Sequence, residues 1–239
     1  MNLIYILLFI LIIFYLLLEI KYFNPKSKCW IKNNLFPEAT EIFNYKHIIL
    51  DELIKILDNN NWSIWATNDY NQTPIFTNMN DVDIIDRLQK NSGKINSNKN
   101  PSWRLFGLIL NKKILPNAQY CPNTIKILNK YSDKILNAGF SLLEPGCLIG
   151  LHKDYNNKFY RLHIPLIIPK NNNKLLNSFI PIEKSTDKLA VLQVENDYKV
   201  WKDDEYFIFD DTCQHNAWNN TNENRIVLII DLLHNNITL

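Results

Sequence analysis

Histidine is scarce in this chain, with five in 239 residues. His152, His163 and His215 lie in the C-terminal half, beside acidic residues and arginines. In His152-Lys153-Asp154 an imidazole and a carboxylate are two positions apart, and on an extended segment this spacing directs both side chains to one face. Both side chains can therefore reach one metal ion.

His215 is the candidate for a third ligand from a distant segment. It is the last residue of the segment 209–215 (FDDTCQH), which begins at the end of the strand predicted at 206–210. Two imidazoles and one carboxylate bind one face of Fe(II) and leave three positions open for co-substrate, O2 or water. A single H-x-D, or a single strand histidine, is more often structural. The combination with the arginine described next is what favours a metal site with His152, Asp154 and His215 as ligands.

Arg225 lies ten residues after His215, at the start of a hydrophobic segment. Arginine is rare here, and the other three are Arg87, Arg104 and Arg161. The rigid, permanently charged guanidinium fork suits bidentate recognition of a carboxylate. We expect Arg225 to hold the distal carboxylate of 2-oxoglutarate at the back of a β-barrel whose mouth contains the iron.

The elements that position these residues are predicted to be mainly β-strands in an α+β chain. Residues 51–57 and 124–136 have the apolar spacing of helices. After Phe140, short β-rich runs follow one another without helices between them, at 140–145, 161–168, 188–194, 206–210 and 225–233. This pattern is typical of an antiparallel jelly roll, a cupin-like double-stranded β-helix, with the N-terminal helices packed on one sheet.

The N-terminus has the pattern of a membrane anchor. Residues 3–18 are sixteen consecutive apolar or tyrosine residues, which as a helix cover about 24 Å of a ~30 Å hydrocarbon core. No basic residue precedes the run and no small-x-small cleavage site follows it, which disfavours a signal peptide. We predict a single transmembrane helix at 1–22, a linker at 23–44 and an oxygenase domain at 45–239, with its jelly-roll core at about 139–235.

Membrane orientation is predicted from the lysines that follow the apolar run, which are Lys21, Lys26, Lys28 and Lys32. By the positive-inside bias they place the domain in the cytosol. The alternative is a lumenal domain, which would suit the four N-x-S/T sequons at Asn61, Asn71, Asn219 and Asn236.

Charge and cysteine content exclude other classes of protein. The formal charge is +2 with a pI of about 8.2, and no Lys/Arg block alternates with aromatic residues, so nucleic-acid binding is not expected. Four cysteines lie far apart, without C-x-x-C or Cys/His spacing. We therefore expect neither a zinc site nor a disulfide framework, and take the cysteines as reduced or buried.

Three motifs resemble the aspartyl/asparaginyl β-hydroxylase family of 2-oxoglutarate oxygenases, over about residues 61–239. The family's F-S-x-x-x-P-G is matched at 140–146, and its R-x-H-L-x-L-x-x-P at 161–169. Its W-x-x-G-x-x-x-x-F-D-D-x-x-x-H-x-x-W is matched at 201–218, with Asp204 in place of the glycine. Asp also tolerates a left-handed conformation, so this departure affects only a turn. The segment 121–124 fits a family element ahead of the core, and equally a plain helix start.

The resemblance implies further site residues. Ser141, Arg161 and His163 occupy positions that line the co-substrate pocket in relatives, together with Arg225. Asp210, Asp211 and Trp218 become candidates for orienting the histidines from behind. The two aspartates have an equally good alternative as caps of a turn.

Asp154 separates two branches of the superfamily. Animal aspartyl hydroxylases have glycine at that place and use two histidines alone. The bacterial lipid A acyl-chain hydroxylases have H-x-D, an N-terminal membrane anchor and a cytosolic domain, and in these respects the chain is similar to them.

The resemblance implies an enzyme that uses Fe(II), 2-oxoglutarate and O2 to hydroxylate a C–H bond. The first expectation for the substrate is an aspartyl or asparaginyl residue of a protein. The alternative is a membrane lipid acyl chain that the anchored domain can reach. A further alternative is a membrane-tethered binding module without activity, which the intact set His152, Asp154, His215 and Arg225 disfavours.

Overall fold

The computed structural model describes residues 28–67, 92–93, 101–154, 158–170 and 188–234. The predicted transmembrane segment, 1–22, lies outside them. Among the helices of the described part, none is long and apolar enough to cross a membrane.

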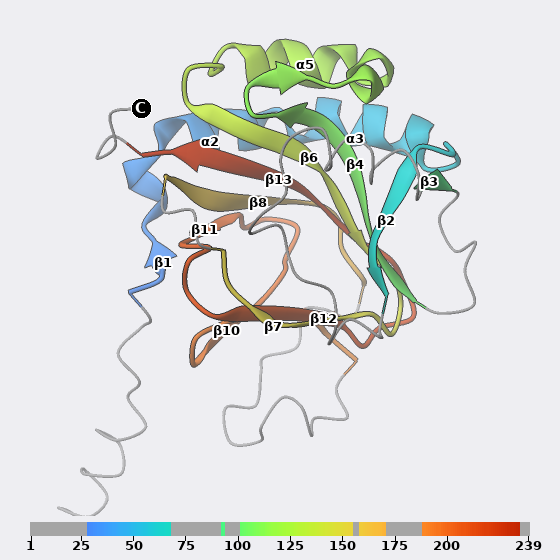
Figure 1. Cartoon of the computed structure of the whole chain (residues 1–239), viewed down its shortest axis with the longest axis vertical. Coiled ribbons are helices and arrows are strands. Elements are labelled where there is room, and N and C mark those ends of the chain that lie inside the picture. Colours follow the sequence, from blue (N-terminus) through green and yellow to red (C-terminus); the bar gives the residue numbers. More distant parts are fainter. Residues whose placement is uncertain (1–27, 68–91, 94–100, 155–157, 171–187, 235–239) are drawn as a thin grey trace, which may run out of the picture.

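Two antiparallel sheets face each other (Figure 1). The smaller sheet has the order β10-β9-β12-β7, and the larger has the order β1-β11-β8-β13-β6-β4-β2-β3, with β5 paired to β4. The strands of the smaller sheet are β10 (Asp197–Val200), β9 (Ala190–Val194), β12 (His215–Asn219) and β7 (Leu148–His152). Those of the larger are β1 (Trp30–Ile31), β11 (Phe207–Phe209), β8 (Phe159–Ile167), β13 (Arg225–Leu233), β6 (Ile135–Leu143), β4 (Ser102–Leu110), β2 (Trp62–Thr67), β3 (Ser92–Gly93) and β5 (Lys113–Ile114).

The chain from β6 to β13 winds between the two sheets. Strands β6, β8, β11 and β13 belong to the larger sheet, and β7, β9, β10 and β12 to the smaller. Eight strands divided in this way form a double-stranded β-helix, so the predicted jelly roll is confirmed. Its described strands extend from residue 135 to residue 233.

Helices cover the outer face of the larger sheet (Figure 1). They are α2 (Pro37–Asn44), α3 (Lys46–Ile56) and α5 (Pro122–Asn129), with short 3-10 turns η1 (Asn33–Leu35) and η3 (Pro116–Tyr120). Ile42, Ile49 and Leu53 are fully buried in the core between helices and sheet. The predicted packing of the N-terminal helices on one sheet is therefore confirmed.

Two predicted boundaries differ from the structure. Residues 28–44, expected as the end of a linker, belong to the domain, because Phe36, Ala39 and Ile42 are buried. Pro37, which suggested a linker, is instead the first residue of α2, where its missing N–H costs nothing. The helix expected over 124–136 ends at Asn129. The turn-forming residues Asn129, Ser132 and Asp133 then lead into β6.

Alternation along β13 explains how polar residues reach the interior. Ile226, Leu228, Ile230 and Leu232 pack in the cluster under the helices. Since successive side chains point to opposite faces, Arg225 and Asp231 point between the two sheets, as does Val227 of the second buried cluster. The space between the sheets therefore receives charged groups from both ends of one strand.

Two of the four cysteines contradict the expectation of free thiols. Cys29 and Cys213 form a disulfide across 184 residues of sequence. Cys121 and Cys147 are free and buried, as expected. Pairing at such a separation leaves no spacing pattern in the sequence, which is why it was missed.

Asn219, one of the four sequon asparagines, is fully buried. Its Nδ2 donates to the carbonyl oxygens of Leu143 (2.8 Å) and Glu223 (2.9 Å), and its Oδ1 accepts from the Thr221 hydroxyl at 2.6 Å. In the folded chain this asparagine is a structural residue. Asn71 and Asn236 lie outside the described residues.

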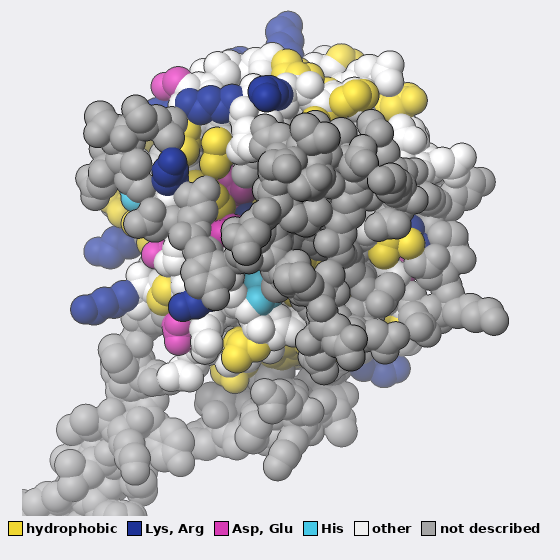
Figure 2. Space-filling model, viewed as in Figure 1, with side chains coloured by type: hydrophobic (Ala, Val, Ile, Leu, Met, Phe, Trp, Pro, Cys, Tyr) yellow, Lys and Arg dark blue, Asp and Glu magenta, His cyan; other side chains and the backbone are white. Residues whose placement is uncertain are grey.

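Figure 2 shows one face of the molecule. Among the residues that the structure describes, the Lys and Arg side chains on this face are separated from one another and do not form a basic stripe.

Candidate active site

Two histidines meet across the smaller sheet. His152 is the last residue of β7 and His215 the first of β12, and the antiparallel register pairs them directly. A register irregularity follows between His215 and Ala217. The two ring centroids are 4.1 Å apart. Sequence reasoning predicted this pair, and the structure brings it together.

Backbone carbonyls fix the tautomer of both rings. Nδ1 of His152 is 2.7 Å from the Gly150 carbonyl oxygen, and Nδ1 of His215 is 2.9 Å from that of Cys213. A carbonyl oxygen can only accept, so we assign the ring proton to Nδ1 in each case. The lone pair then lies on Nε2, the atom available to a metal ion.

Both imidazoles are held neutral. Burial lowers the pKa of His152 to about 4, with His215 contributing in the same direction. Burial likewise lowers the pKa of His215 to about 4. Neutral imidazole is the form that binds metals, so neither ring needs to lose a proton at pH 7 to become a ligand.

Asp211 and Asp210 have different roles although they are adjacent. Asp211 is buried, with Oδ1 3.1 Å from His215 Nε2 and Oδ2 2.7 Å from Arg161 Nη1. Burial raises its pKa to about 7, against the opposing effect of Arg161. Asp210 Oδ1 accepts from the N–H and hydroxyl of Thr212. Asp211 therefore lies beside the nitrogen that a metal would use, whereas an orienting group would bond Nδ1, which the Cys213 carbonyl already occupies. Asp210 caps a turn.

Arg161 is engaged by two aspartates. Besides Asp211, it contacts both carboxylate oxygens of Asp231, at 2.8 and 3.2 Å. Asp231 also accepts from Asn137 Nδ2 at 2.8 Å. A chain of contacts therefore runs from His215 through Asp211 and Arg161 to Asp231. Arg161 was expected to face the co-substrate, whereas here its guanidinium is used within the protein.

Arg225 is buried in a cage without an acidic partner. It is 1% exposed, and its guanidinium carbon lies 4.4 Å from the centroid of the Trp201 ring. Nη1 donates to the Ser141 carbonyl oxygen at 3.3 Å, and Nε has no hydrogen-bond partner. Burial lowers its pKa to about 9. Among the described residues no carboxylate pairs with it, so the cage fits an anionic ligand.

His163 lies in the same interior and is also without polar partners. Neither ring nitrogen has a hydrogen-bond partner, and Trp201, Phe207 and Phe209 surround the ring at centroid distances of 5.9, 5.6 and 5.3 Å. Burial lowers its pKa well below the ordinary value, and Arg225 adds to the effect. A buried imidazole with both nitrogens unused is best explained by a ligand that hydrogen-bonds to it.

Ser141 completes this end of the interior. It is buried on β6, its carbonyl receives Arg225, and its Oγ accepts from Trp103 Nε1 at 3.0 Å. The hydroxyl proton of Ser141 is left to be donated to a neighbouring acceptor. The residues predicted for co-substrate binding at this end, Ser141, His163 and Arg225, are thus grouped around one part of the interior.

Asp154 lies two residues beyond β7, half-buried, and its N–H donates to the Asp211 carbonyl at 2.8 Å. Its charge acts to raise the pKa of His215. Among the described residues, only Cys29, Glu195 and Cys213 form a trio whose ligand atoms all lie within 4.8 Å. Asp154 is therefore near the two imidazoles, but the ligand atoms of Asp154, His152 and His215 do not all lie within 4.8 Å of one another. Its role as ligand stays a prediction.

Trp218, predicted to support the histidines, points away from them. Within β12, His215 pairs with Val194 of β9 and Trp218 pairs with Val191. His215 and Trp218 are three positions apart along the strand, so their side chains lie on opposite faces of the sheet. Trp218 packs with Leu189 and Val191 in a separate cluster.

Two residues of the site were not predicted from the sequence. Asp231 pairs with Arg161, and the Trp201 ring packs against the Arg225 guanidinium. Asp231 had a recognisable signal, since it is the single acidic residue in the apolar run 225–233.

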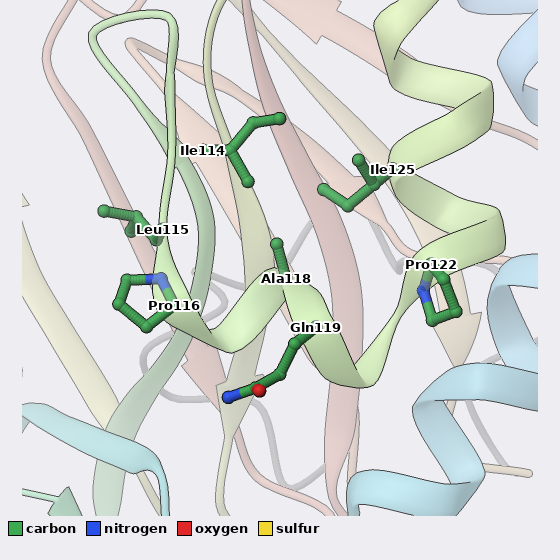
Figure 3. A pocket seen from close by; sticks show the side chains of 7 residues that line it. All are labelled: Ile114, Leu115, Pro116, Ala118, Gln119, Pro122 and Ile125. Atoms are coloured by element: carbon green, nitrogen blue, oxygen red, sulfur yellow. The ribbon is translucent and has the colours of Figure 1, made fainter.

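A pocket of about 530 Å³ lies elsewhere, against η3 and α5 (Figure 3). Its lining, Ile114, Leu115, Pro116, Ala118, Gln119, Pro122 and Ile125, has no titratable side chain. It contributes nothing to the chemistry of the histidine pair.

Comparison with known proteins agrees with the motifs. The family model described as Aspartyl/Asparaginyl beta-hydroxylase matches residues 44–235. An ornithine lipid ester-linked acyl 2-hydroxylase of Rhizobium tropici is 34% identical over 132 residues, 55% of this chain and 41% of that protein. The aspartyl/asparaginyl beta-hydroxylase of Mus musculus is 25% identical over 141 residues, 57% of this chain and 17% of that protein. The chain thus spans less than half the length of these curated relatives.

Solved structures are similar only at a low level. A predicted oxalate decarboxylase of Thermotoga maritima has a TM-score of 0.34 and 14% identity, over 56% of this chain and 82% of that one. That level supports no argument about function. The family model, in contrast, covers most of the chain, including every described strand that contributes to the histidine pair and the arginine cage. The chain therefore belongs to the aspartyl/asparaginyl β-hydroxylase family.

Proposed function

We propose that this protein is an Fe(II)- and 2-oxoglutarate-dependent hydroxylase. The observation that carries the proposal is Arg225, a buried guanidinium with no acidic partner among the described residues. It shares the interior between the sheets with His163 and with a histidine pair whose Nδ1 atoms face backbone carbonyls, so that Nε2 is the nitrogen that would bind a metal, beside Asp211 in the case of His215. An anionic co-substrate that also reaches a metal would account for both ends of this arrangement.

The residues fit the two groups. His152 and His215 would hold iron through Nε2, with Asp154 as the proposed third ligand. Arg225 would bind the distal carboxylate of 2-oxoglutarate, with the Ser141 hydroxyl beside it. When bound, these groups supply the oxidation, in which 2-oxoglutarate and O2 give succinate and CO2 while one oxygen atom enters a substrate C–H bond.

The remaining residues would position the reactants and exclude water. His163, neutral because it is buried, can donate one hydrogen bond to a carboxylate between Arg225 and the histidine pair. Trp201, Phe207 and Phe209 form an apolar wall around it. Such a wall strengthens the electrostatic interactions inside and keeps solvent from the reacting centre.

We propose a lipid acyl chain as the first candidate for the substrate. An aspartyl or asparaginyl side chain is the second. A carboxylate substrate needs a cationic reader at the mouth, and Arg161, whose charge acts on the pKa of both His152 and His215, is already engaged by Asp211 and Asp231. The greater identity to the acyl 2-hydroxylase points the same way. Family membership keeps protein side chains as the second candidate.

We further propose that residues 1–22 anchor the domain in a membrane. Its orientation receives opposing support. The lysines after the apolar run favour the cytosol, whereas the Cys29–Cys213 disulfide favours a lumenal or other oxidising compartment. Alkylation of unfolded protein taken rapidly from cells would distinguish them, since only a reduced pair adds label to both cysteines.

The test of the hydroxylase proposal is Fe(II)-dependent succinate formation by the full-length chain in detergent. We expect turnover with a lipid acyl substrate, and its loss in His215→Ala and Arg225→Ala. The matched control is His234→Ala, because His234 stacks on Tyr160 at a centroid distance of 4.5 Å rather than on His152. Absence of metal binding by the wild-type protein would refute the proposal. Turnover of an Asp- or Asn-containing peptide, without turnover of any lipid offered, would make the protein side chain the first candidate in place of the lipid.

A further inference from the structure

We propose that the disulfide between Cys29 and Cys213 positions His215, so that opening this bond weakens metal binding. The proposal rests on the proposed function, because it takes His215 as a metal ligand. It assigns a role in the reaction to two residues that lie 184 positions apart in the sequence.

The first step concerns the backbone around Cys213. Its carbonyl oxygen is the acceptor that fixes the His215 ring, at 2.9 Å from Nδ1. Its N–H donates to the Asp210 carbonyl at 3.1 Å. A shift of Cys213 therefore moves the atom that sets the orientation and tautomer of the proposed ligand.

The second step concerns the other side of the loop. The Gln214 N–H donates to Glu195 Oε1 at 3.0 Å, and the Glu195 N–H donates to the Gln214 carbonyl at 2.7 Å. These bonds tie the end of the loop to the turn after β9. Cys213 lies between this tie and the turn at Asp210, and the disulfide is its covalent link to another part of the fold.

The third step concerns what holds Cys29. Its carbonyl accepts from the Asp210 N–H at 2.8 Å. The adjoining β1 has two residues, paired with Ile208 and Phe209 of β11, and the Trp30 ring packs edge-on against Phe207 at 5.4 Å. Such a short edge strand is weakly held by backbone pairing alone. The disulfide and strand β1 therefore clamp the loop 210–214 from one side.

Access separates this pair from the other cysteines. Cys29 and Cys213 are half-buried, whereas Cys121 and Cys147 are fully buried. A small reductant can reach the pair in the folded protein. With a water-soluble phosphine, the S–S bond is cleaved, phosphorus is oxidised to the phosphine oxide with an oxygen atom from water, and the two sulfurs become thiols.

The experiment measures the part of Co²⁺ binding that His215→Ala abolishes, as a metal probe that needs no turnover, by full-length protein in detergent. This subtraction excludes Co²⁺ held by the reduced thiols of Cys29 and Cys213 with Glu195, whose ligand atoms lie within 4.8 Å of one another. Wild-type protein is reduced with the phosphine, freed of reductant by desalting under nitrogen, and compared with untreated protein. We expect reduction to weaken Co²⁺ binding about tenfold, the size of effect usual for lost support of a metal ligand, and reoxidation to restore it. Cys29→Ser should show the weak binding without treatment and no response to the phosphine.

The matched control is Cys121→Ala, which removes a buried thiol away from the loop and should respond to reduction as the wild type does. A second readout separates positioning from general destabilisation. The KM for 2-oxoglutarate should change less than twofold on reduction, because Arg225 and Ser141 lie on other strands, while the metal concentration for half-maximal activity rises.

Unchanged Co²⁺ affinity in both reduced wild-type protein and Cys29→Ser would overturn the proposal. So would a parallel rise in the 2-oxoglutarate KM and in the metal requirement, which indicates loss of the fold. If Cys29→Ser does not fold, the reversible reduction of wild-type protein decides alone. Redox-sensitive Co²⁺ binding without succinate formation would support the clamp and refute the hydroxylase.

Discussion

Arg225 and Arg104 are both fully buried arginines, but they differ in their partners. Arg104 donates from Nε to Glu144 at 2.8 Å, an ion pair that is itself buried. Arg225 has a carbonyl, an aromatic ring and an unused Nε. A buried charge without a counter-charge is costly to the fold, and its retention is explained by what it binds.

Replacing each arginine by methionine should therefore have opposite effects on stability. Arg225→Met removes an uncompensated charge, and we expect the melting temperature to stay equal or rise by a few degrees, at about 2–4 °C per kcal/mol. The KM for 2-oxoglutarate should rise at least a hundredfold, on the order of 3 kcal/mol. Arg104→Met leaves Glu144 unpaired and should lower stability by about 3–5 kcal/mol. Thermal unfolding of both variants provides the measurement, and a strongly destabilised Arg225→Met would contradict the interpretation.

Asp211 and Asp210 offer a second comparison between neighbours. We expect Asp211→Asn to lower metal affinity about 10–100-fold, since the amide cannot form the same ion pair with Arg161 while it faces His215. Asp210→Asn keeps an oxygen that can cap Thr212, so its metal affinity should stay within about twofold of wild type. Metal titration of the two variants is the measurement. Equal losses would show that the turn, rather than the contact with His215, controls the site.

The histidines also predict a pH dependence for the metal-free protein. Burial lowers the pKa of His152 and of His215 to about 4, whereas in the unfolded chain each binds a proton near its ordinary value of about 6.5. Between these values the unfolded state holds more protons, so stability falls as the pH falls. Asp211, with its pKa raised to about 7, acts in the opposite direction over about pH 4–7, but it is one group against three, because burial also lowers the pKa of His163.

We expect the urea midpoint to decrease from pH 7 to pH 4.5, with a net loss of a few kcal/mol, at about 1.4 kcal/mol per unit of pKa shift. Added metal displaces protons from the native site, so at a pH where it binds it should leave this slope unchanged or make it steeper. A midpoint that is flat or rises on acidification would show that the carboxylate outweighs the imidazoles.

At the scale of elements, the sequence predicted long apolar strands better than short ones. The run 225–233 was placed correctly as β13, because β-branched and aliphatic residues dominate it. Strand β12 (HNAWN), which supplies His215, has few such residues, and strand β7 (LIGLH), which supplies His152, is short and contains a glycine. The position of both follows from their pairing with each other. The histidine pair was predicted from residue type and spacing, while the strands that carry it were not.

Long-range contacts account for most of what the sequence could not predict at the site. Asp231 meets Arg161 because β13 and β8 pair in that register, and Cys29 meets Cys213 because β1 joins the edge of the same sheet. No local pattern encodes either meeting. Trp218 was a candidate for supporting the histidines, and its position on the opposite face of the sheet was not foreseen for a similar reason, since the face of a strand depends on its register.

Helices α3 and α5 are joined by a buried carboxylate. Glu52 of α3 accepts from the backbone N–H groups of Asn123 and Thr124 and from the Thr124 hydroxyl, each at 2.8 Å. It thus satisfies donors at the start of α5 that have no partner within that helix.

We predict that Glu52→Ala destabilises the domain by about 1–3 kcal/mol, the usual effect of leaving buried donors unpaired. Asp51→Ala is the control, because Asp51 is exposed on the same helix, and its effect should stay within about 0.5 kcal/mol. Urea unfolding measures both. Equal effects would mean that α5 does not depend on this cap.

At the scale of the whole molecule, the described chain enters the fold beside the proposed metal site. Residues 28 and 29 lead into β1 (Figure 1), and Cys29 is bonded to Cys213 of the loop 210–214. We predict that a chain lacking residues 1–22 keeps its activity on a detergent-dispersed acyl substrate but loses at least tenfold on the same lipid in vesicles. Succinate formation with each preparation is the measurement. Equal activities on vesicles with and without the segment would contradict the proposed anchor.

The position of that entry sets a distance. For the proposed anchor ending at residue 22, five residues (23–27) precede Lys28, and at about 3.5 Å each they reach at most about 18 Å. The loop that holds His215 would then stay within a few nanometres of the bilayer, and the enzyme would search a thin layer rather than the surrounding volume. Within this layer a sparse lipid is present at a high effective concentration, so even weak affinity for the acyl chain would suffice for turnover.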